Sequence, residues 1–218
     1  MLRQALVLWV NPQRVEYSVG SQRPIEDFLE TRLQWMPQAM LKGLTRVVRK
    51  NHPFVISKRW YPNPEPIEAL EKYQKVENLF HNRERYEYSV WFAELTGQVH
   101  SAGFATHKDI VMHTEEDVHA FFRDYACALI DSMRADGYRN DKARDTGAAL
   151  IGPGGEVHKS GRGNHRFYVA RLTGASPIPL RVSGVHESWF AELRRAGNGR
   201  VDPEQLAAAL REVEARHQ

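Results

Sequence analysis

One stretch of the chain places a turn, a strand, a glycine-rich loop, a cluster of cations and a helix start in immediate succession. It spans residues 155–172, with the loop at residues 160–164. Glycines there allow backbone N–H groups to approach a ligand closely. The apolar run that follows predicts a helix over residues 167–172, ended by Gly174. A glycine loop that opens a helix predicts an anion site, because the first N–H groups are free and the helix dipole is positive there.

The segments around this loop predict short strands and packed helices. Residues 148–151 and 156–158 predict an antiparallel pair joined by a glycine turn, and residues 178–182 predict a further strand. Upstream, Thr114 and Asp117 form a capping box that opens the strongest predicted helix, residues 115–135, which ends at Gly137. This order predicts an α+β fold, with a small mixed sheet and packed helices.

The first hundred residues show a different pattern. They predict strands at residues 6–10 and 14–19, and helices at residues 24–36, 39–48, 66–73 and 82–95. Residues 51–66 are rich in proline and aromatic side chains and predict a long loop, and residues 100–113 predict another. We therefore expect three parts: an N-terminal extension, helical with short strands (1–100), a core domain (101–190) and a C-terminal helix (191–218).

Composition excludes several classes of protein. The chain has 218 residues, 42% of them hydrophobic, and a formal net charge of +3. No apolar run approaches the roughly 20 residues of a membrane span, so we expect no membrane partner. The single cysteine, Cys127, lies in an apolar helical run and predicts a buried, inert thiol. One cysteine allows no internal disulfide, which favours a cytoplasmic location.

Candidate site residues cluster in and after the glycine loop. The residues expected to bind phosphate are Lys159, Gly161, Arg162, Gly163, Asn164, His165 and Arg166. His165 is also a catalytic candidate, because imidazole can donate to a phosphate oxygen or exchange a proton. A base for an acceptor hydroxyl would come from Asp131, Asp136 or Glu94, and the sequence does not choose between them. His186, after the last predicted strand, is a candidate second-shell residue. His107 and His113 lack the spacing of a metal site, so no metal ligands are predicted.

The ordered segments from Phe121 to His186 resemble the ParB N-terminal / sulfiredoxin superfamily. The resemblance rests on residues 129–137, a helix end, on residues 149–157, on residues 163–172 with their Gly-x-x-Arg loop, and on the Ile-Pro strand at 178–182. It covers about a third of the chain and implies nucleotide phosphates bound at the Gly-x-x-Arg loop. Asn164 replaces the reactive cysteine of sulfiredoxins, which argues against their thiol chemistry. The Gly-Glu-Arg-Arg pattern of ParB is missing, and we expect no helix-turn-helix after His186. The loop, with its His165-Arg166 pair, is most similar to the small kinase and sulfiredoxin branches.

The resemblance and the loop chemistry together imply a nucleotide-binding protein. We expect a nucleotide-dependent phosphotransferase, a kinase or NTPase, that uses ATP or another nucleotide with Mg²⁺ and acts on a small hydroxyl or sugar-like acceptor. The alternative is a ParB-like protein without transferase activity that binds nucleic acid or switches with CTP. The basic residues 42–50 keep that alternative open. Three roles remain for residues 1–100: covering the site, binding the acceptor or forming a homodimer.

Overall fold

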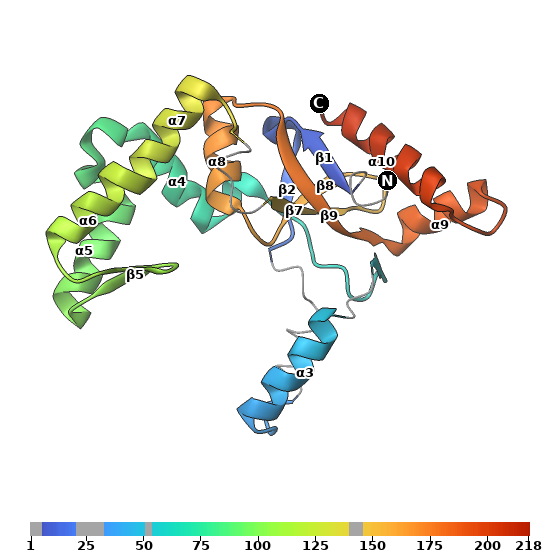
Figure 1. The fold of residues 1–218 in the computed structure, drawn as a ribbon, viewed down its shortest axis with the longest axis horizontal. Coiled ribbons are helices and arrows are strands. Elements are labelled where there is room, and N and C mark those ends of the chain that lie inside the picture. Colours follow the sequence, from blue (N-terminus) through green and yellow to red (C-terminus); the bar gives the residue numbers. More distant parts are fainter. Residues whose placement is uncertain (1–5, 21–32, 51–53, 140–145) are drawn as a thin grey trace.

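The computed structural model describes residues 6–20, 33–50, 54–139 and 146–218. In these ranges the chain forms an α+β fold with one mixed sheet, a separate hairpin and two groups of helices (Figure 1). The sheet strands are β1 (Val7–Val10), β2 (Tyr17–Ser18), β3 (Val55–Ile56), β4 (Glu65–Pro66), β7 (Gly147–Ile151), β8 (Val157–Ser160) and β9 (Ile178–His186); the hairpin strands are β5 (Ala105–His107) and β6 (Ile110–Met112). The helices are α3 (Gln38–Lys50), α4 (Glu71–His81), α5 (Val90–Ala102), α6 (Glu115–Phe121), α7 (Ala128–Asp136), α8 (Asn164–Thr173), α9 (Glu187–Ala196) and α10 (Pro203–Arg216).

The sheet has the order β1-β9-β7-β8-β2-β4, and β3 pairs with the C-terminal end of β9. The predicted antiparallel pair of β7 and β8 is confirmed. β9 runs parallel to β7, and α8 carries the chain between β8 and β9. β1, β2, β3 and β4 come from the first hundred residues. The predicted N-terminal extension therefore contributes strands to the same sheet as the predicted core domain.

β7 and β9 form the centre of the sheet because their residues are apolar on both faces. Every residue of β7 is buried, and β9 is exposed only at Arg181 and partly at Ser183. A strand covered on both faces shows a continuous apolar run rather than an alternating one. Gly184 of β9 lies where a Cβ would meet Ile56 at 2.8 Å and Leu150 at 3.2 Å. A side chain at this position would therefore force the Ile56 and Leu150 side chains to shift, and glycine avoids this.

The helices fall into two groups on the two sides of the sheet. α4 to α8 form one group, and α9 and α10 form the other, with α10 lying along β1 (Figure 1). The backbone N–H of Asn11 donates to the carbonyl of His217 at 2.6 Å, which ties α10 to the end of β1. α8 packs against α4 and α7, so its first turn faces the helical group.

The strongest predicted helix is confirmed, including its start. Thr114 accepts a hydrogen bond from the backbone of Asp117 at 3.1 Å, and the Asp117 carboxylate accepts one from the backbone of Thr114 at 3.0 Å. A π-helical segment, Phe122–Cys127, joins α6 to α7 without a break. Cys127 is buried there, as predicted, and burial raises the pKa of its thiol to about 11.

Several sequence expectations in the helical group were wrong. The helix predicted at residues 66–73 begins only at Glu71, as α4, and the helix predicted at residues 82–95 is broken at Ser89. Residues 100–113 are not a loop, because α5 continues to Ala102 and the β5–β6 hairpin follows. α8 begins at Asn164, three residues earlier than predicted. Most of the predicted helix at residues 24–36 lies outside the described residues.

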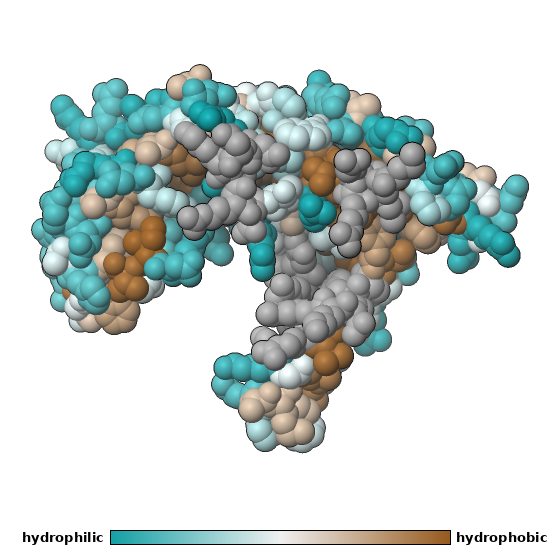
Figure 2. Space-filling model, viewed as in Figure 1, coloured by the Kyte–Doolittle hydropathy of each residue, from teal (hydrophilic) through white to brown (hydrophobic). Residues whose placement is uncertain are grey.

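α3 projects from the body of the protein (Figure 1). Figure 2 shows apolar surface along it, and Trp35, Met40 and Val47 are exposed in this region. α3 confirms the helix predicted at residues 39–48. Among the described residues, no helix has the length and apolar character that a bilayer crossing requires.

Candidate functional site

The first turn of α8 has the features of an anion site. Gly163 precedes it with φ 80°, a left-handed conformation that favours glycine, and an added Cβ would lie 3.0 Å from the Cα of Gly147. Among the described residues no side chain caps this end of the helix, and its first turn contains no acidic residue. The N–H groups of the turn and the positive end of the dipole are thus available to an anion.

Lys159 holds the loop together through hydrogen bonds from its side chain. Its side chain is fully buried, and its ammonium donates to the carbonyls of Ser160 at 2.7 Å and Arg162 at 2.8 Å and to Oδ1 of Asn164 at 2.8 Å. Burial lowers the pKa of Lys159 to about 7. Three acceptors require all three hydrogens of the ammonium, however, so these contacts favour the charged form. Lys159 was predicted to bind phosphate, but its donors are used within the loop.

The bond from Lys159 also sets the orientation of Asn164. An ammonium has no acceptor, so the atom of the Asn164 amide that faces it is the oxygen. The NH₂ end of that amide points the other way, and Asn164 lines two of the cavities around the loop. Asn164 therefore offers two N–H donors to a ligand there.

A central cavity of about 420 Å³ lies against the loop. Gly161, Gly163, Asn164 and His165 line it from the loop and from α8. Its charged lining residues are Lys72, Lys75, Lys108, Arg162 and Glu94. Glu94 forms an ion pair with Lys75. The lining groups are thus predominantly cationic, which attracts an anion.

Two histidines form one wall of the central cavity. His165 stacks on Trp91 with 5.3 Å between ring centroids and 8° between planes, and His107 lies 4.9 Å from His165. Burial, with a smaller contribution from His107, lowers the pKa of His165 to about 3, and burial lowers that of His107 to about 4. Both rings are therefore neutral at pH 7. His165 can donate or accept a hydrogen bond there, but it is a weak base in the free protein.

The neutral histidines predict that acid weakens the fold. Histidines in the unfolded chain bind protons below about pH 6.5, whereas His165 resists protonation down to about pH 3. The unfolded state thus binds more protons between these values, and each such histidine lowers the free energy of unfolding by up to about 1.4 kcal/mol per pH unit. Urea denaturation at several pH values between 7.5 and 4.5 should show this decline. His165→Gln should make the decline shallower, and the exposed His113→Gln should not. An equal slope in His165→Gln and the wild type would contradict the assignment.

Arg166 lines a different cavity, here called the α7 cavity. It has a volume of about 260 Å³ between the first turn of α8 and α7. Its other lining residues include Tyr125, Ser132, Tyr138 and Arg139. Lys108 of the central cavity donates to the hydroxyl of Tyr125 at 3.0 Å, so one lining residue of each cavity takes part in this contact.

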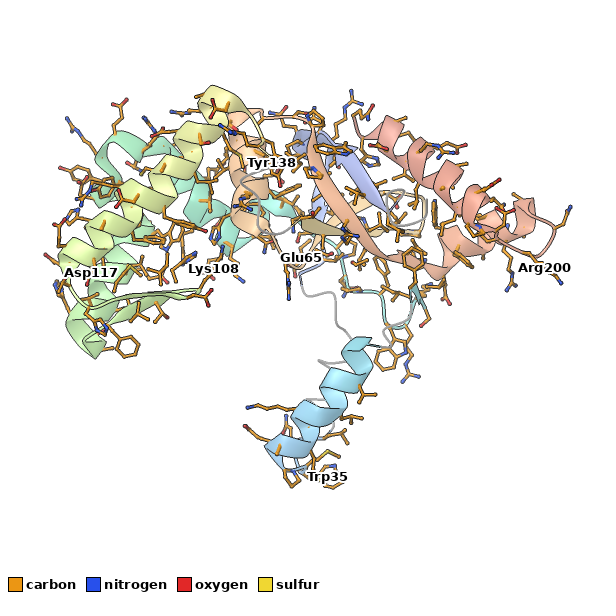
Figure 3. The ribbon with its side chains drawn as sticks, viewed as in Figure 1. Trp35, Glu65, Lys108, Asp117, Tyr138 and Arg200 are labelled. Atoms are coloured by element: carbon orange, nitrogen blue, oxygen red, sulfur yellow. The ribbon has the colours of Figure 1, made fainter. Side chains whose placement is uncertain are left out.

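A third cavity, the β2 cavity, lies on the sheet side of the loop and has a volume of about 510 Å³. It shares Lys72, Gly161, Asn164 and Tyr168 with the central cavity. Its remaining lining includes the end of β2 together with Asn63 and Glu65 before α4. In Figure 3, Lys108 lies toward the helical group and Glu65 toward the sheet.

The structure brings one of the three candidate bases to the loop. Glu94 lines the central cavity. Asp131 forms an ion pair with Arg83, and Asp136 lies 3.6 Å from Arg139 at the end of α7. Neither carboxylate lines any of the three cavities.

His186 is also outside the three cavities. It caps α9, where its Nδ1 accepts a hydrogen bond from the backbone of Ser188 at 3.1 Å, and its ring lies 4.9 Å from that of Tyr61. These contacts support the start of α9 rather than the loop.

Several residues that line the cavities were not predicted from the sequence. Lys72 and Lys75 of α4, Lys108 of the hairpin, and Glu65 and Glu71 lie far from the loop in sequence. A local signal existed for the lysines, because their spacing places both on one face of a helix. Nothing local indicated that this face would meet α8.

Described residues 6–20, 33–50, 54–139 and 146–218 contain no group of three or more His, Cys, Asp or Glu side chains arranged to hold a metal ion. Comparison of the chain with protein-family models, curated proteins and solved structures finds no match.

Proposed function

We propose that this protein is a nucleotide-dependent phosphotransferase that acts on a small hydroxyl or sugar-like acceptor. One observation carries the proposal: the uncapped first turn of α8 opens into a cavity with predominantly cationic lining groups. Phosphoryl transfer depends mainly on positioning and on neutralising charge, and this arrangement supplies both.

The terminal phosphates would bind in the central cavity. Lys72, Lys108 and Arg162 supply positive charge, and the first turn of α8 supplies backbone N–H groups. The Asn164 amide adds donors whose direction Lys159 sets. Neutral His165 can donate one further hydrogen bond to a phosphate oxygen.

The α7 cavity fits the nucleoside end of the donor. It offers the aromatic rings of Tyr125 and Tyr138 beside apolar Leu129 and Met133, the lining that a base requires. Arg166 and Arg139 lie in the same cavity and can reach phosphate. Lys108 of the central cavity and Tyr125 of this cavity are in contact, and the proposal places one extended nucleotide across both cavities.

Mg²⁺ fits this site only as a partner of the phosphates, because Glu94 is the one carboxylate among the described lining residues of the central cavity. A nucleotide's Mg²⁺ typically keeps several waters and takes one or two protein carboxylates. When bound, the ion would neutralise charge on the transferring phosphoryl group.

The order of elements around the loop supports a fold of the ParB/sulfiredoxin type. The β7–β8 hairpin, the glycine loop, α8 and the parallel strand β9 follow one another as the resemblance implies. Sulfiredoxin-like thiol chemistry is not proposed. Cys127 is buried with its Sγ 3.8 Å from the carbonyl of Arg83, and the resemblance puts Asn164 where sulfiredoxins have their reactive cysteine.

Thermal shift with ATP, ADP, CTP and GTP, each with Mg²⁺, tests the proposal. A nucleotide at 100 times its dissociation constant should stabilise the fold by about 2.7 kcal/mol, which raises Tm by several degrees. Arg162→Ala and Arg166→Ala should each weaken binding about tenfold, because each removes a charge-assisted contact. Arg200→Ala is the control, since Arg200 lies at the far end of the molecule (Figure 3).

The absence of a shift with every nucleotide would overturn the proposal. A shift that survives both Arg162→Ala and Arg166→Ala would place the nucleotide elsewhere.

A nucleic-acid-binding function is the second candidate, and one observation favours it. Residues 31–64 contain seven Lys and Arg residues and no acidic residue, and α3, which lies within them, projects from the body (Figure 1). This alternative predicts affinity for DNA that falls steeply with salt through counterion release. Titration of the protein with labelled duplex DNA at 50 and 200 mM salt tests this alternative. If the protein is instead the transferase, DNA should not protect it against thermal unfolding.

A further inference from the structure

The β2 cavity differs in charge from the central cavity that it adjoins. Two carboxylates, Glu65 and Glu71, line it with the amide of Asn63, and Lys72 is its cation. Neither carboxylate makes an ion pair or side-chain hydrogen bond with another described residue. Both are exposed acceptors around a cavity of about 510 Å³. A lining of this kind binds hydroxyl or amino groups and disfavours an anion.

The junction of the two cavities lies beside the expected phosphates. Lys72, Asn164 and Tyr168 line both cavities, so a ligand in the β2 cavity abuts one in the central cavity. Burial raises the pKa of Tyr168 to about 12, so its phenol stays a neutral donor at this boundary. Glu71 is the first residue of α4 and directly precedes Lys72. Of the two carboxylates, it is therefore the one adjacent in the chain to the junction.

We propose that the β2 cavity is the acceptor site, that it takes a neutral or amino-bearing polyol, and that Glu71 is the base. This inference rests on the proposed phosphotransferase function. The acceptor hydroxyl gives its proton to the Glu71 carboxylate while its oxygen bonds to the terminal phosphorus of the nucleotide. The bond from that phosphorus to the bridging oxygen breaks, and the nucleoside diphosphate leaves with the electron pair. Glu71 then returns the proton to solvent.

Glu65 has a different role in this scheme. It lies in β4, at the edge of the sheet next to β2, and accepts hydrogen bonds from a second hydroxyl or an amino group of the acceptor. It holds the acceptor and does not take the proton. The same negative charge disfavours an acceptor that already carries phosphate.

Transfer of label from a terminally labelled nucleotide tests the inference, using the full chain with Mg²⁺ and whichever nucleotide gives the largest thermal shift. Glycerol, glucose and glucosamine serve as acceptor probes, and glycerol 3-phosphate, glucose 6-phosphate and glucosamine 6-phosphate as their anionic counterparts. Neutral and amino-bearing probes should be labelled, and their phosphorylated counterparts about tenfold less. Glu71→Gln should lower kcat about 100-fold with little change in KM. Glu65→Gln should raise KM about tenfold, and the exposed, remote Glu204→Gln should change neither.

Thermal shift in the same samples separates the two proposals. Nucleotide protection in Glu71→Gln together with the loss of transfer supports the acceptor site. Protection without transfer to any polyol probe overturns the acceptor class and leaves nucleotide binding intact. Transfer that is lost in Glu94→Gln but not in Glu71→Gln moves the base to the central cavity and overturns the assignment of Glu71. If no nucleotide protects the wild type against thermal unfolding, the proposed function itself is overturned.

Discussion

Lys159→Met is expected to lower the free energy of unfolding by about 3 kcal/mol, because it leaves three hydrogen-bond acceptors without their shared donor. The methionine fills a similar volume but cannot reach the carbonyls of Ser160 and Arg162 or Oδ1 of Asn164. The loop then loses the contacts that hold its glycines in place. Urea denaturation measures the loss, and Lys72→Met, at an exposed lysine of α4, is the matched control.

A double-mutant cycle with Asn164→Ala tests whether Lys159 acts through Asn164. If Lys159 orients that amide, the losses of nucleotide affinity in Lys159→Met and Asn164→Ala should not add. Full additivity would show that the two residues act independently. A Lys159→Met protein as stable as the wild type would contradict the account of the loop.

Trp91→Ala should destabilise the protein by about 3–5 kcal/mol, the range for large aromatic side chains removed from a core. Trp91 is only 6% exposed, and its ring lies 5.5 Å from Phe121 and 5.6 Å from Phe122. It also stacks on His165, so its removal should loosen the wall of the central cavity. Thermal or urea unfolding measures the loss of stability. Nucleotide protection in the same variant measures the loosening of the cavity wall.

Trp35→Ala is the matched control for this prediction. Trp35 is 76% exposed before α3 (Figure 3), so its loss should change stability by less than about 0.5 kcal/mol. Similar losses in the two variants would contradict a buried, cavity-supporting role for Trp91.

Local patterns predicted the elements around the loop. The Thr114 capping box, the glycine turn between β7 and β8, and the stop at Gly174 each depend on residues close together in sequence. The start of α8 was missed because Gly163 in a left-handed conformation replaced the usual side-chain cap. The helix predicted at residues 82–95 is interrupted, and Tyr88, just before the interruption, is 73% exposed. A break in the helix between residues 88 and 90 changes its direction.

The site was predictable only on the loop side. The loop glycines, Asn164 and His165, which were predicted to bind phosphate, line the central cavity. Lys159 has the residue type of a phosphate ligand, but the direction of its side chain within β8 is a property of the sheet. The lysines of α4 and the carboxylates of the β2 cavity reach the loop through the packing of α4 on α8. Such packing depends on contacts between residues about a hundred positions apart, which no local pattern contains.

The sheet order has a consequence for synthesis on the ribosome. Val7 pairs with Arg181 and Val55 with Val185, so β1 and β3 both depend on β9. These strands leave the ribosome long before β9 does, and until then their backbone groups have no partner in this sheet. Such non-local pairing slows folding and leaves edges open to other chains. We therefore expect the nascent protein to be more prone to aggregation until residues 178–186 have emerged.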